Sequence, residues 1–279
     1  KGWIPVSDDA VTDAPVAPVT QKAIFGYGTG PTAITNLVSS SGVVASDVTG
    51  VGTARSALGA ATYGTDKVIF GYGYDGSANV SISNLVNNSG VVATDVTGVG
   101  TVRQSPAAAS YGVDKAIFGF GEPNTAITNL VSNVGVVATD TAGVGTARTG
   151  PGASSYGGDK AIFGYGLAGS NTAVTNLVSN TGVVAADVTG VGTARRYPAA
   201  AGYGTDKGIF GFGYTSSNVS MTNLVSNVGV VAADVTGVGS ARRGLGASSY
   251  GGDKAIFGYG QTSGYTGITN LVSSSGVVA

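Results

Sequence analysis

Short apolar runs alternate with turn-forming residues along the chain. Within residues 55–100, runs rich in Ala, Ile, Phe and Val are separated by turns that contain Gly, Asn or Asp; the runs occupy 60–63, 67–72, 81–86 and 91–96. The β-branched and aromatic residues fit strands, and the turn residues supply positive φ angles or local side-chain hydrogen bonds. No stretch keeps the 3.6-residue apolar period of an amphipathic helix. The pattern therefore predicts four short strands in this unit and no helices.

The same unit recurs six times. Variants of Lys-Ala-Ile-Phe-Gly-Tyr-Gly place a phenylalanine at 25, 70, 118, 163, 210 and 257, so repeats of about 46 residues begin near 22, 67, 115, 160, 207 and 254. An Asn-Leu-Val marker lies 34 residues before each following phenylalanine, but 11 to 14 residues after its own. All length variation therefore falls in one connection per repeat, between the second and third strands. Such variation predicts a surface loop.

Repeated four-stranded units predict an all-β fold, a six-bladed β-propeller of four-stranded antiparallel blades, with residues 1–279 as a single domain. Residue 279, the last of the chain, occupies the position of the repeat that comes just before the position occupied by residue 1. We therefore expect the N-terminal segment, residues 1–21, to close the ring. Residues 1–7 would form the outer strand of the last blade and 14–19 the inner strand of the first. The start of the chain, without Met or a signal-like apolar stretch, is typical of a mature or trimmed product.

Each unit resembles the kelch repeat. An arginine is followed by a strand of small residues, a turn and an Ile-Phe-Gly strand that ends in glycines, as in Arg55, Ala60, Ala61 and the run 69–73. The chain differs from kelch repeats in two ways: an aromatic residue splits the glycine pair, and the late tryptophan is absent. The resemblance implies a propeller that binds partners through loops on one face, and it implies no single activity.

Composition removes several classes of function. Charged residues make up only 10% of the chain, the net charge is −1, and there is no His or Cys. Disulfides, common zinc sites, Cys nucleophiles and His acid–base chemistry are thereby excluded. No single-sign field would attract nucleic acid, and no run of about 18 apolar residues would cross a membrane. We expect no catalytic residues, no metal site, no cofactor, no nucleic-acid partner and no membrane insertion.

Charged residues recur at fixed positions in the repeat. Asp-Lys pairs precede each second strand, where a solvated turn explains them. Five arginines, here called the framework arginines, each follow an aspartate by eight residues; they are Arg55, Arg103, Arg148, Arg195 and Arg242. This spacing suggests structural pairs such as Asp187 with Arg195. The alternative is a ring of arginines around the pore that binds an anion.

Two regions differ between the copies: the connection between the second and third strands, and the three residues after each framework arginine. In an up-and-down blade both regions lie at the same end, so one face of the disc is predicted to be variable and the other uniform. A variable face is typical of a binding module, although neutral drift in loops is the alternative. The candidate ligand-binding residues are Tyr74, Asp75, Glu122, Asn124, Arg196, Tyr197, Tyr214, Arg243 and Tyr265.

Aromatic rings and short polar groups in one surface suit carbohydrate recognition. The sequence therefore suggests a non-catalytic module that binds a glycan or a cell-surface protein. The four tyrosines of the set are expected to be solvent-exposed. A composition poor in charge and rich in Gly, Ser, Thr, Asn and Val suggests an extracellular or virion-surface protein, such as a phage appendage. A structural protein that docks another protein is the alternative, and a glycan-active enzyme is the more remote one.

Overall fold

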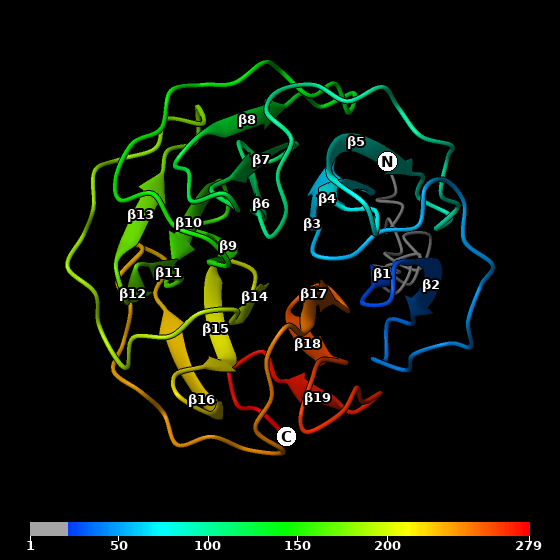
Figure 1. The fold of residues 1–279 in the computed structure, drawn as a ribbon. Helices are drawn as coiled ribbons and strands as arrows, with labels where there is room; N and C mark the ends of the chain where they lie inside the picture. The colour runs from blue at the N-terminus through cyan, green and yellow to red at the C-terminus, as the bar shows by residue number, and fades with distance from the viewer. Residues whose placement is uncertain (1–21) are drawn as a thin grey trace, which may run out of the picture.

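The computed structural model describes residues 22–279, and these residues form an all-β fold (Figure 1). The described residues contain strands and turns but no helix, as predicted. From here on a repeat is counted by its sheet and begins at the framework arginine before the small-residue strand. By this count the strands are β1 (Ala23–Gly28) and β2 (Thr32–Val38); β3 (Gly59–Tyr63), β4 (Lys67–Tyr74) and β5 (Asn79–Val86); β6 (Ala107–Tyr111), β7 (Lys115–Gly119) and β8 (Thr128–Val131); β9 (Gly152–Tyr156), β10 (Lys160–Gly164), β11 (Leu167–Ala168), β12 (Ser170–Asn171) and β13 (Thr175–Val178); β14 (Ala199–Tyr203), β15 (Lys207–Tyr214) and β16 (Asn218–Val225); β17 (Gly246–Tyr250), β18 (Lys254–Gly258) and β19 (Thr269–Val272).

Each repeat after the first forms a three-stranded antiparallel sheet in sequence order, as in β3-β4-β5. The first repeat contributes the pair β1-β2, and β11-β12 is a small extra hairpin. The register repeats as well: Phe70 lies opposite both Ala60 and Asn84, and the corresponding residues pair in the same way in the other three-stranded sheets. The first three predicted strands of the repeat are therefore confirmed.

The predicted fourth strand is wrong: the sheets have three strands. The segment 91–96 pairs with β5 only at two bridges, Val86 with Val92 and Ser83 with Val96, and the register shifts between them. The side-chain amide of Asn84 donates to the carbonyl oxygen of Ala93 at 3.0 Å. The Asn84 side chain therefore occupies a backbone carbonyl oxygen that a continuous β-ladder would use as an acceptor. As a result, the segment 91–96 runs along the edge of the sheet as an irregular, bulged chain.

The sheets pack around a common centre, with their first strands innermost (Figure 1). Consecutive first strands β3, β6, β9, β14 and β17 contact one another, and β1 of the first repeat contacts β17 of the last. Segments that follow the third strands run along the circumference in Figure 1. The described residues thus connect the first and last repeats directly. The expected closing strands at 1–7 and 14–19 lie outside the described residues.

One aromatic ring per repeat fills the space between neighbouring sheets. A side chain on Gly71 would begin 2.7 Å from Cζ of Phe118 in the next sheet, so only glycine fits there. The same contact joins Gly258 of the last sheet to Phe25 of the first, with a corresponding distance of 2.8 Å. Tyr72 packs edge-to-face on Phe118, with 5.1 Å between the ring centroids. The first glycine of each Gly-aromatic-Gly motif is therefore required by the packing of the sheets.

The aromatic residue between the two glycines has an unusual backbone. Tyr72 has φ 65°, and its counterparts in the other repeats have φ between 62° and 65°. The register of β4 and β5 shifts between Gly71 and Gly73, which identifies a β-bulge at this tyrosine. The bulge directs the Tyr72 ring under the guanidinium of Arg103, whose Cζ lies 3.9 Å from the ring centroid. The framework arginines are thus held by aromatic rings of the preceding repeat.

All five framework arginines are completely buried. Arg195 donates hydrogen bonds to the carbonyl oxygens of Phe212 and Thr193 and, at 2.7 Å, to Oδ1 of Asn223. Burial lowers the pKa of the corresponding Arg148 to about 10. Because solvent does not reach these side chains, the alternative of an anion-binding ring of framework arginines is wrong.

The expected partner of each framework arginine is also wrong. Arg195 lies 3.9 Å from Asp234, whereas Asp187 accepts hydrogen bonds from Thr146 and Asn176. The reason is topological: Val188 bridges to Thr175 on β13, so the neighbouring Asp187 belongs to the sheet that Arg148 precedes. The pairing of Arg195 is structural, as expected, but its aspartate, Asp234, follows the last strand of the sheet that Arg195 precedes.

The Asp-Lys pairs form solvated turns at one end of the sheets, as predicted. The ion pair between Lys67 and Asp66 measures 2.8 Å, and its two side chains are 41% and 46% exposed. The N–H of Gly64 beside this turn donates to the carbonyl oxygen of Asp114 in the next repeat at 2.7 Å. The turns therefore link neighbouring sheets and carry no perturbed, buried lysine of the kind that catalysis uses.

Candidate functional site

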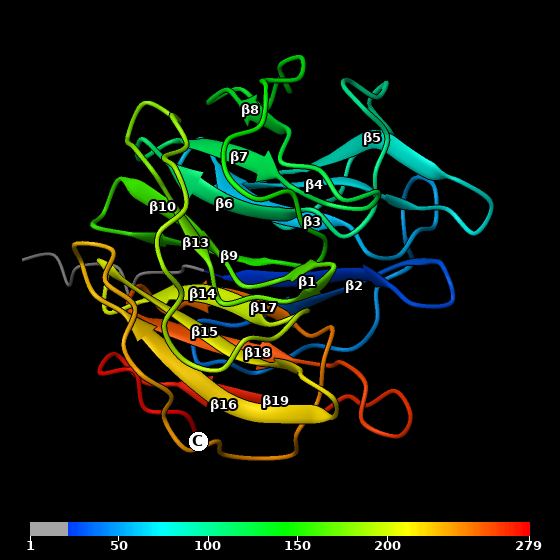
Figure 2. The ribbon, with the colours of Figure 1, turned by 60° about the vertical axis from the view of Figure 1, so that its left-hand side comes forward.

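The two variable regions meet at the end of the sheets opposite the Asp-Lys turns. The first residue after each framework arginine forms an antiparallel bridge with a residue of the second strand or the loop after it; the pairs are Ser56 with Tyr74, Gln104 with Glu122, Thr149 with Leu167, Arg196 with Tyr214, and Arg243 with Gln261. This confirms that both variable regions lie at one end. Figure 2 shows the β1–β2 and β4–β5 connections projecting from the same side. We call this end, formed by the loops and the residues after the framework arginines, the variable face.

Backbone hydrogen bonds join the repeats at the centre of the variable face. The second residue after each framework arginine has a left-handed backbone, with φ between 51° and 62°. From the second of these residues onward, each N–H donates to the carbonyl oxygen of its counterpart in the preceding repeat, as from Ser105 to Ala57 at 2.6 Å. The residues of this mouth ring are Ala57, Ser105, Gly150, Tyr197 and Gly244. The variable side chains are therefore mounted on a regular, hydrogen-bonded backbone.

Two members of the mouth ring fit each other. The ring of Tyr197 covers Gly150 of the preceding repeat, where a Cβ atom would lie 2.4 Å from Cδ1 and Cε1 of the tyrosine. At Gly244 the same hypothetical atom would meet nothing within 4 Å. The glycine at 150 and the tyrosine at 197 are thus complementary. At this pair of positions the difference between the copies has a steric reason, which argues against neutral sequence drift as the only cause of the variation.

A cavity of about 1290 Å³ lies within the mouth ring and reaches the inner strands. Its lining includes the small residues Ala108 and Ala200 of the inner strands together with residues of the variable face. Of the predicted site residues, the cavity brings together Glu122, Asn124, Arg196, Tyr197, Arg243 and Tyr265. Tyr74, Asp75 and Tyr214 lie on the same face but outside this lining.

The expected exposure of the tyrosines is confirmed only at Tyr265, which is 69% exposed. Tyr74, Tyr197 and Tyr214 are half-buried. Tyr74 folds over its own loop and donates its hydroxyl to the carbonyl oxygen of Gly76 at 3.0 Å. The other two pack on neighbouring residues of the face. Sequence alone does not show a contact such as that of Tyr197 with Gly150, because it joins residues of different repeats.

Tyr214 lies beside two arginines of the variable face. The guanidinium carbons of Arg196 and Arg243 lie 4.8 and 4.6 Å from the centroid of its ring. Arg243 also donates from Nε and Nη2 to Oε1 of Gln261, at 3.2 and 3.1 Å. Both arginines are half-buried, in contrast to the fully buried Arg195 next to one of them. Gln261 is a further candidate site residue that was not predicted from the sequence; its position opposite Arg243 in the ladder is the signal that identifies it.

Asp75 has a local structural role. Its Oδ1 accepts hydrogen bonds from the N–H groups of Ala78 and Ser77, and these bonds hold the pKa of Asp75 below its usual range. This is an Asx-type turn that shapes the connection between β4 and β5. The Asp75 carboxylate therefore shapes the loop and is less available to a ligand than a free carboxylate would be. Glu122 is exposed at the cavity.

Asparagine side chains link neighbouring loops. Asn218 donates to the carbonyl oxygens of Gln261 and Thr262, and Asn171 donates in the same way to Tyr214 and Thr215. Each of these bonds joins a loop to that of the next repeat. The connections of the variable face are thus cross-linked, which pre-organises the face for binding.

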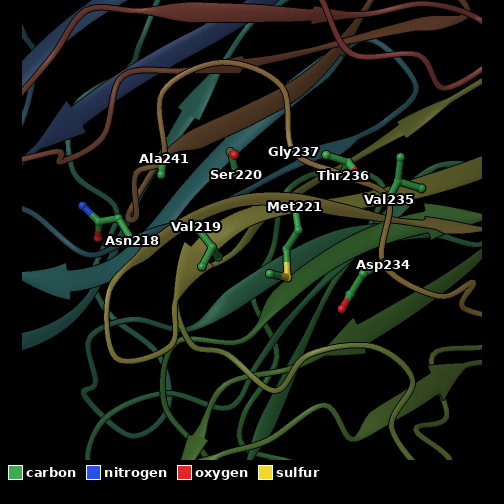
Figure 3. Close-up of a pocket in the computed structure, with 9 residues that line it drawn as sticks. All are labelled: Asn218, Val219, Ser220, Met221, Asp234, Val235, Thr236, Gly237 and Ala241. Atoms are coloured by element: carbon green, nitrogen blue, oxygen red, sulfur yellow. The ribbon is translucent and has the colours of Figure 1, made fainter.

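A second hollow, of about 410 Å³, lies at the outer edge of the fifth sheet (Figure 3). Met221, Val235 and Asp234 are among the residues around it (Figure 3). The Asp234 carboxylate accepts hydrogen bonds from Thr193 and Asn223. Since its one charged group is already engaged, this hollow is a weaker candidate than the central cavity.

Residues 22–279 contain no group of three or more His, Cys, Asp or Glu side chains that could hold a metal ion. In the same range, no helix is long and apolar enough to cross a membrane. The chain matches no protein-family model and no curated protein.

Proposed function

We propose that the chain is a six-bladed β-propeller of kelch-like repeats that recognises a glycan or cell-surface ligand with its variable face. The cyclic order of packing, in which Phe25 contacts the last sheet, supports the propeller. Three strands and a bridged outer segment give each repeat after the first four passes of the chain. The kelch likeness rests on the arginine and glycine motifs alone.

The observation that carries the binding function is the pairwise meeting of the two variable regions around one cavity. The sheet register and the bridges at the mouth recur between repeats, so the differences are concentrated in the loops and in side chains at the cavity mouth. Tyrosine faces, amides and guanidinium groups in one cross-linked surface suit sugar rings and hydroxyl groups. Recognition without catalysis, in an extracellular or virion-surface setting, is the function that this arrangement favours.

A glycan array with the purified chain tests this proposal, followed by titration of the best-bound glycan. Tyr265→Ala should weaken binding by about 1–2 kcal/mol, because an exposed aromatic face at the cavity is a typical binding hot spot. Val113→Ala is the matched control, since Val113 is 68% exposed beside an Asp-Lys turn at the other end. Equal affinity of both variants and the parent chain would contradict the site.

A second candidate function is favoured by a repeated apolar feature. A valine at one fixed position in the turn after the last strand of each repeat is exposed, with exposed fractions between 61% and 66%; these are Val43, Val91, Val136, Val183, Val230 and Val277. Val134 and Val228 are also exposed in two of these turns. Asn88 of one such turn bonds to Asp66, which places these valines near the Asp-Lys end. A structural protein could dock through this end. Serine in place of several of these valines would abolish co-assembly if docking is the function and leave glycan binding unchanged.

A glycan-active enzyme is the third and most remote candidate. Incubation of the chain with each bound glycan, followed by mass analysis of the products, tests it directly.

A further inference from the structure

Two arginines on the variable face have no carboxylate partner in the part of the chain that the structure describes. Arg196 and Arg243 form no ion pair there, whereas the lysines of the Asp-Lys pairs do. The side chain of Arg196 makes no hydrogen bond to a described residue, and that of Arg243 bonds only to the neutral Gln261. Several N–H groups of both guanidinium groups therefore remain available at the cavity.

The two arginines also lie close together. Both guanidinium carbons lie within 5 Å of the ring centroid of Tyr214, so the two carbons are less than 10 Å apart. Cation–π attraction holds each guanidinium on the ring, but the two positive charges repel each other. A bound anion would remove this repulsion and accept the free N–H groups. Guanidinium groups match carboxylate and sulfate oxygens with two parallel hydrogen bonds.

The other repeats do not offer this arrangement. The residues corresponding to Arg196 are Ser56, Gln104 and Thr149, and the ladder partner of Gln104 is the acidic Glu122. Among the described residues of the variable face, positive charge is confined to the fifth and sixth repeats, with carboxylates at the second (Asp75) and the third (Glu122). A ligand with one negative group would bind in a single orientation on an otherwise six-fold repeated frame.

We infer that Arg196 and Arg243, held by Tyr214, bind an anionic group of the ligand, a sugar carboxylate or sulfate. This inference deepens the proposed function and rests on it for the sugar part of the ligand. The anion would lie at the mouth of the cavity, where Tyr197 and Tyr265 are near enough to line the same space. The chemical class of ligand is therefore an acidic glycan.

Calorimetric titration with three probes tests the inference: lactose, 3′-sialyllactose and lactose 3′-sulfate. At least one acidic probe should bind about tenfold more tightly than lactose at low salt, because hydrogen bonds to charged groups are stronger than neutral ones. The preference should decrease as ionic strength rises. The two acidic probes distinguish a carboxylate ligand from a sulfate ligand.

Variants assign the preference to residues. Arg196→Gln and Arg243→Gln should each reduce affinity for the preferred acidic probe about tenfold and reduce lactose affinity much less, so that the preference for the acidic probe decreases. Arg196→Lys keeps the charge but loses the paired donors, so its affinity should be intermediate. Lys115→Gln is the matched control, because it removes one positive charge at an Asp-Lys turn of the opposite end, and it should not weaken binding of the acidic probe. Unfolding temperatures of all variants report whether the fold is kept.

The outcomes separate the two proposals. Lactose or other neutral glycans that bind as tightly as the acidic probes would overturn the inference and leave glycan recognition intact. If no glycan binds, sulfate at constant ionic strength is the second probe. Stabilisation of the parent chain by sulfate that is lost in Arg196→Gln would keep the anion site and reject the glycan. Equal responses of the two proteins to sulfate would overturn the anion site.

Discussion

Arg195 and Arg196 are neighbours in the sequence, but their guanidinium groups lie in different surroundings. Arg195 is fully buried on the ring of Tyr165, with 4.1 Å between Cζ and the ring centroid, and its N–H groups are bonded. Arg196 is half-buried on the variable face. One residue type therefore serves the frame at one position and the surface at the next. Sequence repetition separates the two roles, because only the first arginine recurs in every complete repeat.

This difference predicts opposite consequences for stability. Arg195→Ala should lower the free energy of unfolding by about 3–5 kcal/mol, because it leaves buried carbonyl oxygens and Asp234 without their partner. Arg196→Ala should cost about 1 kcal/mol or less, mainly from the contact with Tyr214. Denaturant unfolding of both variants measures the two values. Similar losses in the two variants would show that the assignment of roles is incorrect.

The buried network also predicts sensitivity to acid. Partial burial alone would raise the pKa of Asp187, but hydrogen bonds from Thr146 and Asn176 outweigh it and hold the pKa below its usual range. The same holds at Asp95, Asp140 and Asp234. A carboxylate whose pKa is lower in the folded state stabilises the fold above its unfolded pKa of about 3.9. That contribution disappears as the pH falls through the folded pKa.

Unfolding in urea at pH 7 and pH 3 checks this. Asp187→Asn should be less stable than the parent chain at pH 7, and the difference should shrink at pH 3, where the parent aspartate is also becoming neutral. Lys160→Gln at an exposed Asp-Lys turn is the control and should show little effect at either pH. A difference of the same size at both pH values would mean that the ionised form of Asp187 does not stabilise the fold.

At the scale of the element, periodicity and turn residues were sufficient to locate the first three strands of each repeat. The predicted strand at 60–63 corresponds to β3, and those at 67–72 and 81–86 lie within β4 and β5. The outer segment was not predictable, because Val91 and Val92 have the same strand preference as Val86. Its irregular pairing arises from the Asn84 side chain, which contacts a residue nine positions away. The bulge at Tyr72 was missed for a similar reason.

The candidate site was predictable in position more than in detail. Comparison of the copies located the variable face, since both variable regions adjoin the same strand ends. The contacts between repeats, such as Tyr214 with Arg243, depend on how neighbouring sheets pack. Tyr197 is similar, because its ring lies over a glycine of another repeat. A single repeat read alone contains no information about these neighbours.

The mouth ring offers a matched pair of glycines. Gly150 and Gly244 have φ 58° and 62°, so alanine at either position carries a similar backbone strain of about 1–2 kcal/mol. Only Gly150→Ala would also displace the Tyr197 ring. We expect Gly150→Ala to be the more destabilising variant and to weaken ligand binding. In a Tyr197→Ala background the two alanine variants should have equal unfolding free energies; a persistent excess at position 150 would mean that another contact is responsible.

The first and last repeats meet through contacts between distant parts of the chain, and Phe25 is central to them. Phe25 packs against Gly246 and Gly258 of the last repeat and edge-to-face on Tyr259, at 5.2 Å between ring centroids. Bringing these ends together costs loop-closure entropy, but this cost rises only slowly with the length of chain between them. As a result, a face of the last sheet that would otherwise be exposed to solvent is packed against the first repeat. The variable face needs this closure, because the anion-binding repeats are the fifth and sixth.

A comparison of two phenylalanines tests closure. Phe163 occupies the same position between the third and fourth sheets, where sequence-adjacent repeats pack regardless of closure. In a closed ring Phe25→Ala and Phe163→Ala should both lower the unfolding free energy by about 3–5 kcal/mol, since each leaves a cavity between two sheets. In an open arrangement Phe25 would face solvent, and its replacement would cost far less than that of Phe163. Guanidinium unfolding of the two variants, with a single shared transition in each, distinguishes the cases. A small loss at position 25 together with a large loss at position 163 would contradict the cyclic packing on which the binding face depends.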